Sequence, residues 1–174
     1  MGFKYVRVSS LYMANANVFL APVEPGGFDR TVRSAVELSE YPDRPGALAG
    51  TDEARFWGVA DESNNRTYFE KMEPGDLVLF YGEEGYVGTG WIGTTFEDGD
   101  GWASATFWDD EPLSLVYTIE DFTPVSVPKA AVNAIFDYGG GYSPGGLMRV
   151  ADERVTDQPE TIKRAVEMYD RRKG

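Results

Sequence analysis

The sequence contains neither cysteine nor histidine in its 174 residues. The lack of cysteine excludes disulfide bonds and thiolate chemistry. The lack of histidine removes the commonest general base and the commonest metal ligand, so Ser-His-Asp catalysis, Cys-His catalysis and ordinary zinc sites are excluded. The phosphate-binding motif G-x-x-x-x-G-K-[ST] is missing as well. We therefore expect no catalytic residues, no metal and no cofactor, and any hydrolytic mechanism would have to use carboxylates.

Long hydrophobic runs are equally scarce. No stretch approaches the roughly 20 apolar residues of a membrane-spanning helix, and the N-terminal residues lack the apolar core of a secretory signal peptide. The sequence therefore predicts a cytoplasmic protein with no membrane partner.

Basic residues are few, with 16 Lys and Arg against 29 Asp and Glu and a formal net charge of −13. Taken alone, this balance argues against a polyanionic partner, because phosphate binding normally needs a basic surface. Acid excess with scarce lysine, scarce isoleucine and no cysteine is also typical of proteins from a high-salt cytoplasm. In about 1 M salt the screening length falls to about 3 Å, so long-range repulsion of nucleic acid largely disappears. We therefore predict an acidic, halophilic protein whose binding depends on stacking and hydrogen bonds.

Hydrophobic residues make up 42% of the chain and aromatic residues 14%, enough to bury a sizeable core in a single domain spanning residues 1–174. Short apolar runs separated by turns are typical of a small, curved sheet. We predict an α+β fold, a small curved β-barrel of five to six strands flanked by short helices, with a core at about residues 18–150. Candidate strands lie at 18–22, 55–60, 77–81, 86–92, 103–108, 113–118 and 122–127, and candidate helices at 29–38, 67–72, 128–136 and about 158–172.

Five segments together suggest a family. RFWGVAD (55–61), MEPGDLVLFY (72–81) and GYVGTGWIG (85–93) resemble the EVE-like and YTH-like branch of the PUA-like superfamily. The similarity continues in FWDDEPLSLVYTIEDFTPVSVP (107–128) and YSPGGLMRV (142–150). These segments are similar to the modified-base-reading domains found at the N-termini of modification-dependent restriction proteins.

The resemblance implies a domain that binds one flipped, modified nucleobase, methylated cytosine or adenine, in an aromatic pocket and has no catalysis of its own. Trp57 matches the first pocket tryptophan of the family, on the strand before an Asn-containing helix. The second pocket aromatic normally comes from the later strands, where Trp91, Trp108 and Phe122 are all candidates. The implied partners are nucleic acid with a modified base, DNA being favoured over RNA, and a nuclease or motor subunit of a defence system.

Further candidates come from the chemistry of single residues. Tyr81 could belong to the pocket because its hydroxyl needs a hydrogen-bond partner. Asp110 follows Trp108 closely and could accept a hydrogen bond from an exocyclic amine of the base. The glycines at 88, 90 and 93 would let a nucleotide approach the strand closely. Candidate phosphate contacts are Arg66, Lys71 and Arg149, with salt bridges on an acid-rich surface as the alternative.

Two other hypotheses remain open. The same fold could be an RNA-binding module that recognises methylated adenine, and a reader of the 2′-OH would then favour RNA over matched DNA. Alternatively, the chain could bind a small ligand or be a carboxylate-dependent enzyme that uses the same pocket. Turnover lost on mutation of a carboxylate pair would favour this last hypothesis.

Overall fold

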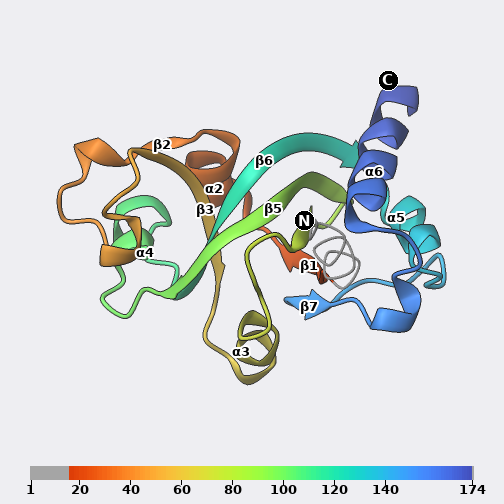
Figure 1. The fold of residues 1–174 in the computed structure, drawn as a ribbon, viewed down its shortest axis with the longest axis horizontal. Helices are drawn as coiled ribbons and strands as arrows, with labels where there is room; N and C mark the ends of the chain where they lie inside the picture. The colour runs from red at the N-terminus through yellow and green to blue at the C-terminus, as the bar shows by residue number, and fades with distance from the viewer. Residues whose placement is uncertain (1–15, 174) are drawn as a thin grey trace, which may run out of the picture.

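The computed structural model describes residues 16–173, with side chains described as far as residue 170. Seven strands form one mixed sheet in the order β2-β3-β6-β5-β4-β1-β7. The β1–β4 pair is parallel and every other pair is antiparallel. The sheet curves strongly (Figure 1), and among residues 16–173 no strand pairs with the outer edges of β2 and β7, so the described strands do not close into a barrel. The predicted α+β class is confirmed, with seven strands where the sequence predicts five or six.

The bounds of the elements agree with most of the predicted segments. The C-terminal helix and the hairpin strands lie where the sequence places them, whereas the first fifteen residues of the predicted 1–174 domain lie outside the described residues. Within the described part, no helix is long and apolar enough to cross a membrane. The strands are β1 Val18–Pro22, β2 Val36–Glu37, β3 Glu53–Val59, β4 Leu77–Tyr81, β5 Tyr86–Glu97, β6 Leu115–Val127 and β7 Met148–Arg149; the helices are α2 Pro25–Phe28, α3 Ser63–Phe69, α4 Trp102–Phe107, α5 Lys129–Ile135 and α6 Pro159–Lys173. Short turns are the π-helical η1 Asp29–Arg33 and the 3-10 turns η2 Leu38–Glu40, η3 Gly46–Leu48 and η4 Asp152–Arg154.

The strand predicted at 103–108 is wrong, because these residues belong to helix α4. The Asp98 carboxylate accepts hydrogen bonds from the backbone N–H of Trp102 at 3.2 Å and of Ala103 at 2.8 Å. It thereby satisfies donors that a helix start leaves without partners. The buried residues Ala103 and Phe107 lie four positions apart, a helical spacing that also fits the sequence.

Several further boundaries differ from the prediction. Helix α3 spans Ser63–Phe69 where the sequence predicts 67–72, and β5 continues to Glu97 beyond the predicted end at residue 92. The helix expected at 29–38 begins earlier, at Pro25, whose fixed φ suits the first position of a helix. It ends in the π-helical turn η1, and the chain then adds the short edge strand β2. The strands expected at 113–118 and 122–127 form one long strand, β6, which bends where its register against β5 shifts.

The strands alternate between two separate hydrophobic clusters, one on each face of the sheet. Along β4, Val78 and Phe80 join the first cluster, whereas Leu77, Leu79 and Tyr81 join the second. This period of two is what a pleated strand produces. Because both faces are covered, the central strands read as continuous apolar runs.

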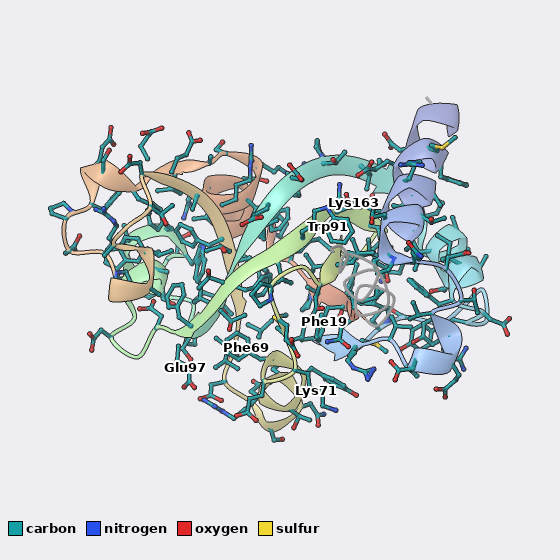
Figure 2. All side chains as sticks on the ribbon, in the orientation of Figure 1. Phe19, Phe69, Lys71, Trp91, Glu97 and Lys163 are labelled. Atoms are coloured by element: carbon teal, nitrogen blue, oxygen red, sulfur yellow. The ribbon has the colours of Figure 1, made fainter. Side chains whose placement is uncertain are left out.

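Helix α6 covers the second face through a buried polar contact. Lys163, only 8% exposed, donates to Glu167 at 2.6 Å, and Thr89 of β5 donates to the same carboxylate at 2.9 Å. Burial alone would raise the pKa of Glu167, but these hydrogen bonds outweigh it and lower that pKa. Figure 2 shows Trp91 close to Lys163, on the side of the sheet that α6 covers.

The glycines of β5 face side chains of β6 at close range. A Cβ on Gly88 would lie 2.4 Å from Cε1 of Phe122, and a Cβ on Gly90 would lie 2.5 Å from Cγ2 of Ile119. A Cβ on Gly93 would meet β6 just as closely. These glycines therefore make room for β6, which corrects the interpretation that they admit a nucleotide.

Gly88→Ala is expected to lower the free energy of unfolding by about 1–3 kcal/mol, the usual cost of overpacking a filled site. The added methyl would displace the Phe122 ring, which packs against the first cluster. Urea denaturation measures the effect. Gly50→Ala is the matched control, because a Cβ there meets nothing within 4 Å. Equal unfolding midpoints for the two variants would show that Phe122 moves aside freely.

Candidate functional site

Two adjoining hollows meet at Trp57 of β3. One has a volume of about 220 Å³ and the other about 210 Å³. Both are lined by Glu24, Trp57, Glu111 and Leu113, and we call the pair of hollows the indole pocket. The first hollow is completed by Pro25, Gly26, Gly27, Trp108 and Asp109, and the second by Pro22, Val23, Gly58, Val59, Ala60 and Asn65.

The two indole rings of this pocket are held firmly. Trp57 is 1% exposed and donates its Nε1–H to the carbonyl of Pro22 at 2.9 Å. Trp108 is 3% exposed and donates to Oγ1 of Thr31 at 3.2 Å. The rings meet edge to face, with centroids 5.1 Å apart and planes at 70°. A base therefore cannot lie between them here, and a ligand would contact their pocket-facing edges.

Gly27 of α2 packs against both indole rings, Trp57 and Trp108. A Cβ at this position would lie 2.8 Å from Cδ1 of Trp108 and 3.2 Å from Cζ3 of Trp57. Only glycine lets the α2 backbone approach both rings this closely. The Pro-Gly-Gly start of α2 is thus a part of the site, and it lies outside the five segments that suggest the family.

A strained turn follows Trp108. Asp109 and Asp110 both have left-handed backbones, with φ of 52° and 65°, which few residues other than glycine adopt. Arg30 donates from Nη1 to the carbonyl of Phe107 at 2.7 Å and to Asp109 at 3.0 Å. This arrangement places Asp109 at the pocket, while Asp110, the predicted hydrogen-bond acceptor, is exposed and lies outside the lining.

Two exposed carboxylates, Glu24 and Glu111, line both hollows. The sequence prediction misses them because many acids of this chain are exposed and no local pattern distinguishes these two. Asn65 of α3 also lines the pocket. It donates to the carbonyl of Ala60 at 3.0 Å and accepts from the backbone N–H of Leu147 at 3.1 Å. It thus joins the pocket to the loop before β7.

The other predicted pocket aromatics lie elsewhere in the described structure. Trp91 packs in the second cluster, under α6. Tyr81 is also in that cluster and donates its hydroxyl to the carbonyl of Gly146 at 2.6 Å. Burial, and to a lesser extent Tyr142, raises the pKa of Tyr81 to about 12. Phe122 packs on the first face against Phe28 and Phe80. Of the predicted set, the structure therefore brings only Trp57 and Trp108 together.

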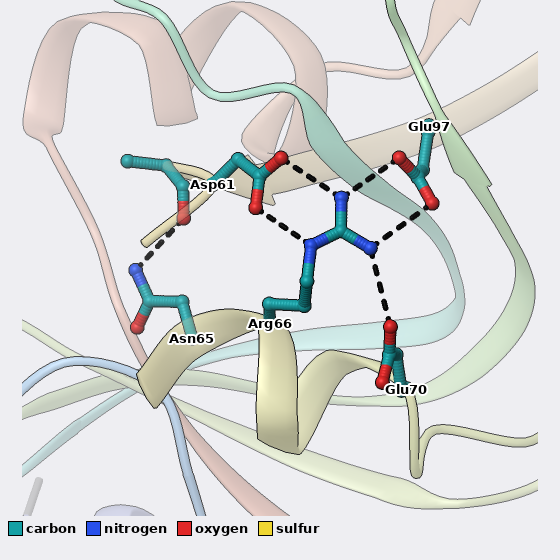
Figure 3. Close-up of polar contacts among 6 residues, drawn as sticks. Asp61, Asn65, Arg66, Glu70 and Glu97 are labelled. Atoms are coloured by element: carbon teal, nitrogen blue, oxygen red, sulfur yellow. Dashed lines mark hydrogen bonds and ion pairs between the residues drawn. The ribbon is translucent and has the colours of Figure 1, made fainter. Parts of the chain in front are cut away.

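The predicted phosphate contacts differ in their surroundings. Arg66 lies among three carboxylates, at 2.8 Å from Asp61, 2.8 Å from Glu97 and 3.2 Å from Glu70 (Figure 3). Its hydrogen bonds lower the pKa of Asp61 and of Glu97. In this arrangement the three neighbouring carboxylates neutralise the charge of Arg66, which makes Arg66 a poor phosphate contact.

Lys71 and Arg149 are less constrained than Arg66. Lys71 is exposed, with its ammonium 6.0 Å from the ring centre of Tyr68. Arg149 donates to an exposed carboxylate, that of Asp152, at 3.2 Å. An exposed pair of this kind is weak, so both cations can be offered to an anionic ligand.

A larger hollow adjoins the indole pocket, with which it shares Val23, Glu24 and Pro25, but neither tryptophan lines it; it lies between α2, the β4–β5 turn and the end of β6. Its volume is about 910 Å³, and its lining includes the apolar Val23, Phe28 and Val87. Four acids surround them, and its one basic residue, Arg33, is 3.0 Å from Asp29. This acidic lining suits a cation better than a phosphate. Within residues 16–173, no cluster of three acidic side chains is positioned to hold a metal ion.

No protein-family model matches the sequence, and no curated protein matches it. Among solved structures, the N-terminal domain of Thermococcus gammatolerans McrB bound to m5C DNA matches with a TM-score of 0.64 and 20% sequence identity. The match covers 80% of this chain and 93% of that chain. The NMR structure of Rpa0253 from Rhodopseudomonas palustris matches with a TM-score of 0.50 and 18% identity, over 88% of this chain and 94% of that chain. The PUA-like, EVE-like fold that the motifs imply is therefore confirmed.

Proposed function

We propose that this protein binds DNA that carries a modified base, methylated cytosine or methylated adenine, and that it is a reader rather than an enzyme. The observation that carries the proposal is the indole pocket, a lined hollow with two tryptophans, in a fold shared with a domain solved in complex with m5C DNA. The reader would act in a restriction or defence system, together with a nuclease or motor subunit.

The chemistry of the pocket suits a flipped base. A base cannot reach the pocket from within a duplex, so it must leave the stack. Its apolar faces would meet the edge of Trp57 and the side chain of Leu113, and an edge-to-face aromatic contact of this kind contributes about 0.5–1.5 kcal/mol beyond the burial of apolar area. Glu24 and Glu111 would accept hydrogen bonds from an exocyclic amine, as acids do from cytosine N4. A methyl group that is buried there adds on the order of 0.8 kcal/mol.

The negative charge of the chain sets the conditions for binding. At a net charge of −13, long-range repulsion opposes DNA at low salt. In molar potassium chloride the repulsion is screened, and contacts in the pocket decide affinity. A halophilic cytoplasm, as the composition predicts, would provide this condition.

Binding of fluorescent oligonucleotides in molar potassium chloride tests the proposal. We expect a methylated duplex to bind about three- to tenfold more tightly than its unmethylated twin, the effect of one buried methyl group and its improved fit. Matched RNA is the comparison that separates DNA reading from RNA reading. Equal affinity for every modified and unmodified strand would contradict the proposal that the protein reads a modified base. Tighter binding of methylated RNA than of methylated DNA would show that the target is RNA.

A further inference from the structure

Beside the indole pocket lies a chain of tyrosines and cations that the proposed pocket does not use. Tyr138 stacks on Tyr142 with centroids 4.1 Å apart and planes at 12°, and the guanidinium of Arg154 lies 4.5 Å from the Tyr138 ring centre. Next to Tyr142, Ser143 accepts a hydrogen bond from Lys129 at 3.1 Å. These residues, with Tyr68 and Lys71 of α3, form what we call the tyrosine face.

The two halves of the tyrosine face adjoin each other. Figure 1 shows α3 and β7 side by side at the lower edge of the molecule, and Figure 2 shows Lys71 on the same edge. Burial and the neighbouring Tyr142 raise the pKa of Tyr138, and Tyr68 of α3 contributes to the same effect. Lys71 lies over Tyr68. The aromatic and basic groups therefore follow one another from α3 to α5.

The part of this face in residues 122–151 differs in charge from the rest of the chain, whereas Lys71 and Arg154 stand beside acids in the sequence. Residues 122–151 contain one acid, Asp137, whereas 29 acids in 174 residues would give about five in a stretch of thirty. Ion pairs occupy five of the described lysines and arginines. Of the six that form no ion pair within residues 16–170, three lie here: Lys71, Lys129 and Arg154.

The loop between α5 and β7 has glycines that the fold does not require. A Cβ on Gly139, Gly140, Gly141 or Gly145 would meet nothing within 4 Å, and none of the four has a positive φ. Glycine in such places only adds conformational entropy to the unfolded chain. Bare backbone is useful where another molecule approaches closely.

The loop is nevertheless tied down at both ends. At its start, the side-chain amide of Asn133 donates to the carbonyls of Gly139 at 3.1 Å and Tyr142 at 2.9 Å. At its end, Gly146 accepts from Tyr81, and Leu147 donates to Asn65 of the indole pocket. The loop is thus a fixed feature that borders the pocket.

We propose that the tyrosine face binds the DNA strand next to the flipped base, with Lys71 and Lys129 contacting phosphates and the glycine loop lying against the sugar-phosphate backbone. This inference rests on the proposed function. Cations beside aromatic rings are the usual footprint of nucleotides outside a duplex, and base flipping swings one nucleotide, with its sugar and phosphates, out of the duplex. Phosphate contacts hold the strand regardless of sequence or methylation.

The test removes two charges from this face in the full chain. We expect Lys71→Gln combined with Lys129→Gln to weaken binding of the methylated duplex and of its unmethylated twin by the same factor, about tenfold. The slope of log affinity against log salt should become shallower by about 1.5, because two phosphate contacts are lost. Arg33→Gln combined with Arg164→Gln removes the same charge elsewhere and is the matched control. Equal losses in the two double variants would overturn the inference.

The glycines provide a second test that does not depend on charge. Gly140→Ala with Gly141→Ala should leave the melting temperature unchanged or raise it, yet weaken DNA binding at least about threefold through loss of close approach. Gly46→Ala with Gly50→Ala is the control, since a Cβ meets nothing there either. Unchanged binding in the 140/141 variant would also overturn the inference.

The two proposals fail in different ways. A wild-type protein that prefers methylated DNA, with the tyrosine-face variants binding as well as wild type, would remove the tyrosine face alone. A wild-type protein with no methyl preference, whose DNA affinity still falls in the tyrosine-face variants, would remove the reader function alone. A wild-type protein that binds no DNA would remove both.

Discussion

Trp57→Ala is expected to lower the free energy of unfolding by about 3–5 kcal/mol, the range for removing a buried tryptophan from a core. The side chain is 1% exposed and contacts Phe28 and Trp108 edge to face. Its removal would also leave the carbonyl of Pro22 without the indole N–H and leave Gly27 facing a void. A loss of this size is a large part of the stability of a typical domain, so urea denaturation should show a much lower midpoint.

Trp57→Phe is the control that separates packing from hydrogen bonding. It keeps most of the aromatic volume and removes the indole N–H, so we expect a clearly smaller loss than for alanine. If Trp57→Ala unfolds at the same urea concentration as the wild type, the ring contributes little to the core. The sequence-based hypothesis of a free pocket wall, with binding weakened about tenfold and the fold intact, would then hold instead.

The burial of Trp57 illustrates what the sequence can and cannot predict. Strand β3 follows from its composition, and the motif resemblance marks Trp57 as a pocket residue. Whether its ring is a free wall or a core residue depends on Gly27 and Trp108, which lie 30 and 51 positions away. Contacts at such separations leave no local signal, so the sequence alone supports both interpretations.

The strand predicted at 103–108 is wrong and the β4–β5 hairpin is predicted well, each for a physical reason. The alternating residues at 103–108 fit a strand, but Asp98, four residues before α4, caps a helix there. The hairpin β4–β5 is predicted well because its apolar runs, its Gly-Glu-Glu-Gly turn and its register agree. The sequence alone leaves open on which face of the sheet the Trp91 side chain lies. The register of β5 pairs Trp91 with Leu77, so Trp91 lies on the face of the second cluster.

The candidate site was only partly accessible to sequence reasoning. Trp57 and Trp108 do line one pocket, as two of the four proposed indole and phenyl groups. The acids that line it are Glu24 and Glu111. The positions of two loops bring them to the pocket, and no sequence motif predicts them. In a chain with 29 acids, only the fold distinguishes two of them.

Ala60→Phe is expected to abolish the preference for methylated DNA while leaving the fold intact. Ala60 is half-buried, lines the second hollow of the indole pocket and holds Asn65 through its backbone carbonyl, which the substitution keeps. A phenyl group here would occupy a hollow of about 210 Å³ and exclude the base. The lost edge-to-face contact with Trp57 corresponds to about 0.5–1.5 kcal/mol, or about two- to thirteenfold in affinity.

Ala165→Phe is the matched control, because residue 165 is exposed on α6 and outside the lining of the pocket. Both variants should melt near the wild-type temperature, and only Ala60→Phe should bind methylated and unmethylated duplexes equally. If Ala60→Phe keeps the full preference for methylated DNA, the base enters the protein at another site.

The Ala60→Phe substitution should leave the salt dependence of DNA binding unchanged, because the phosphate contacts remain. Together with the shallower slope expected for the lysine variant, this result would assign base selection to the indole pocket and strand binding to the tyrosine face.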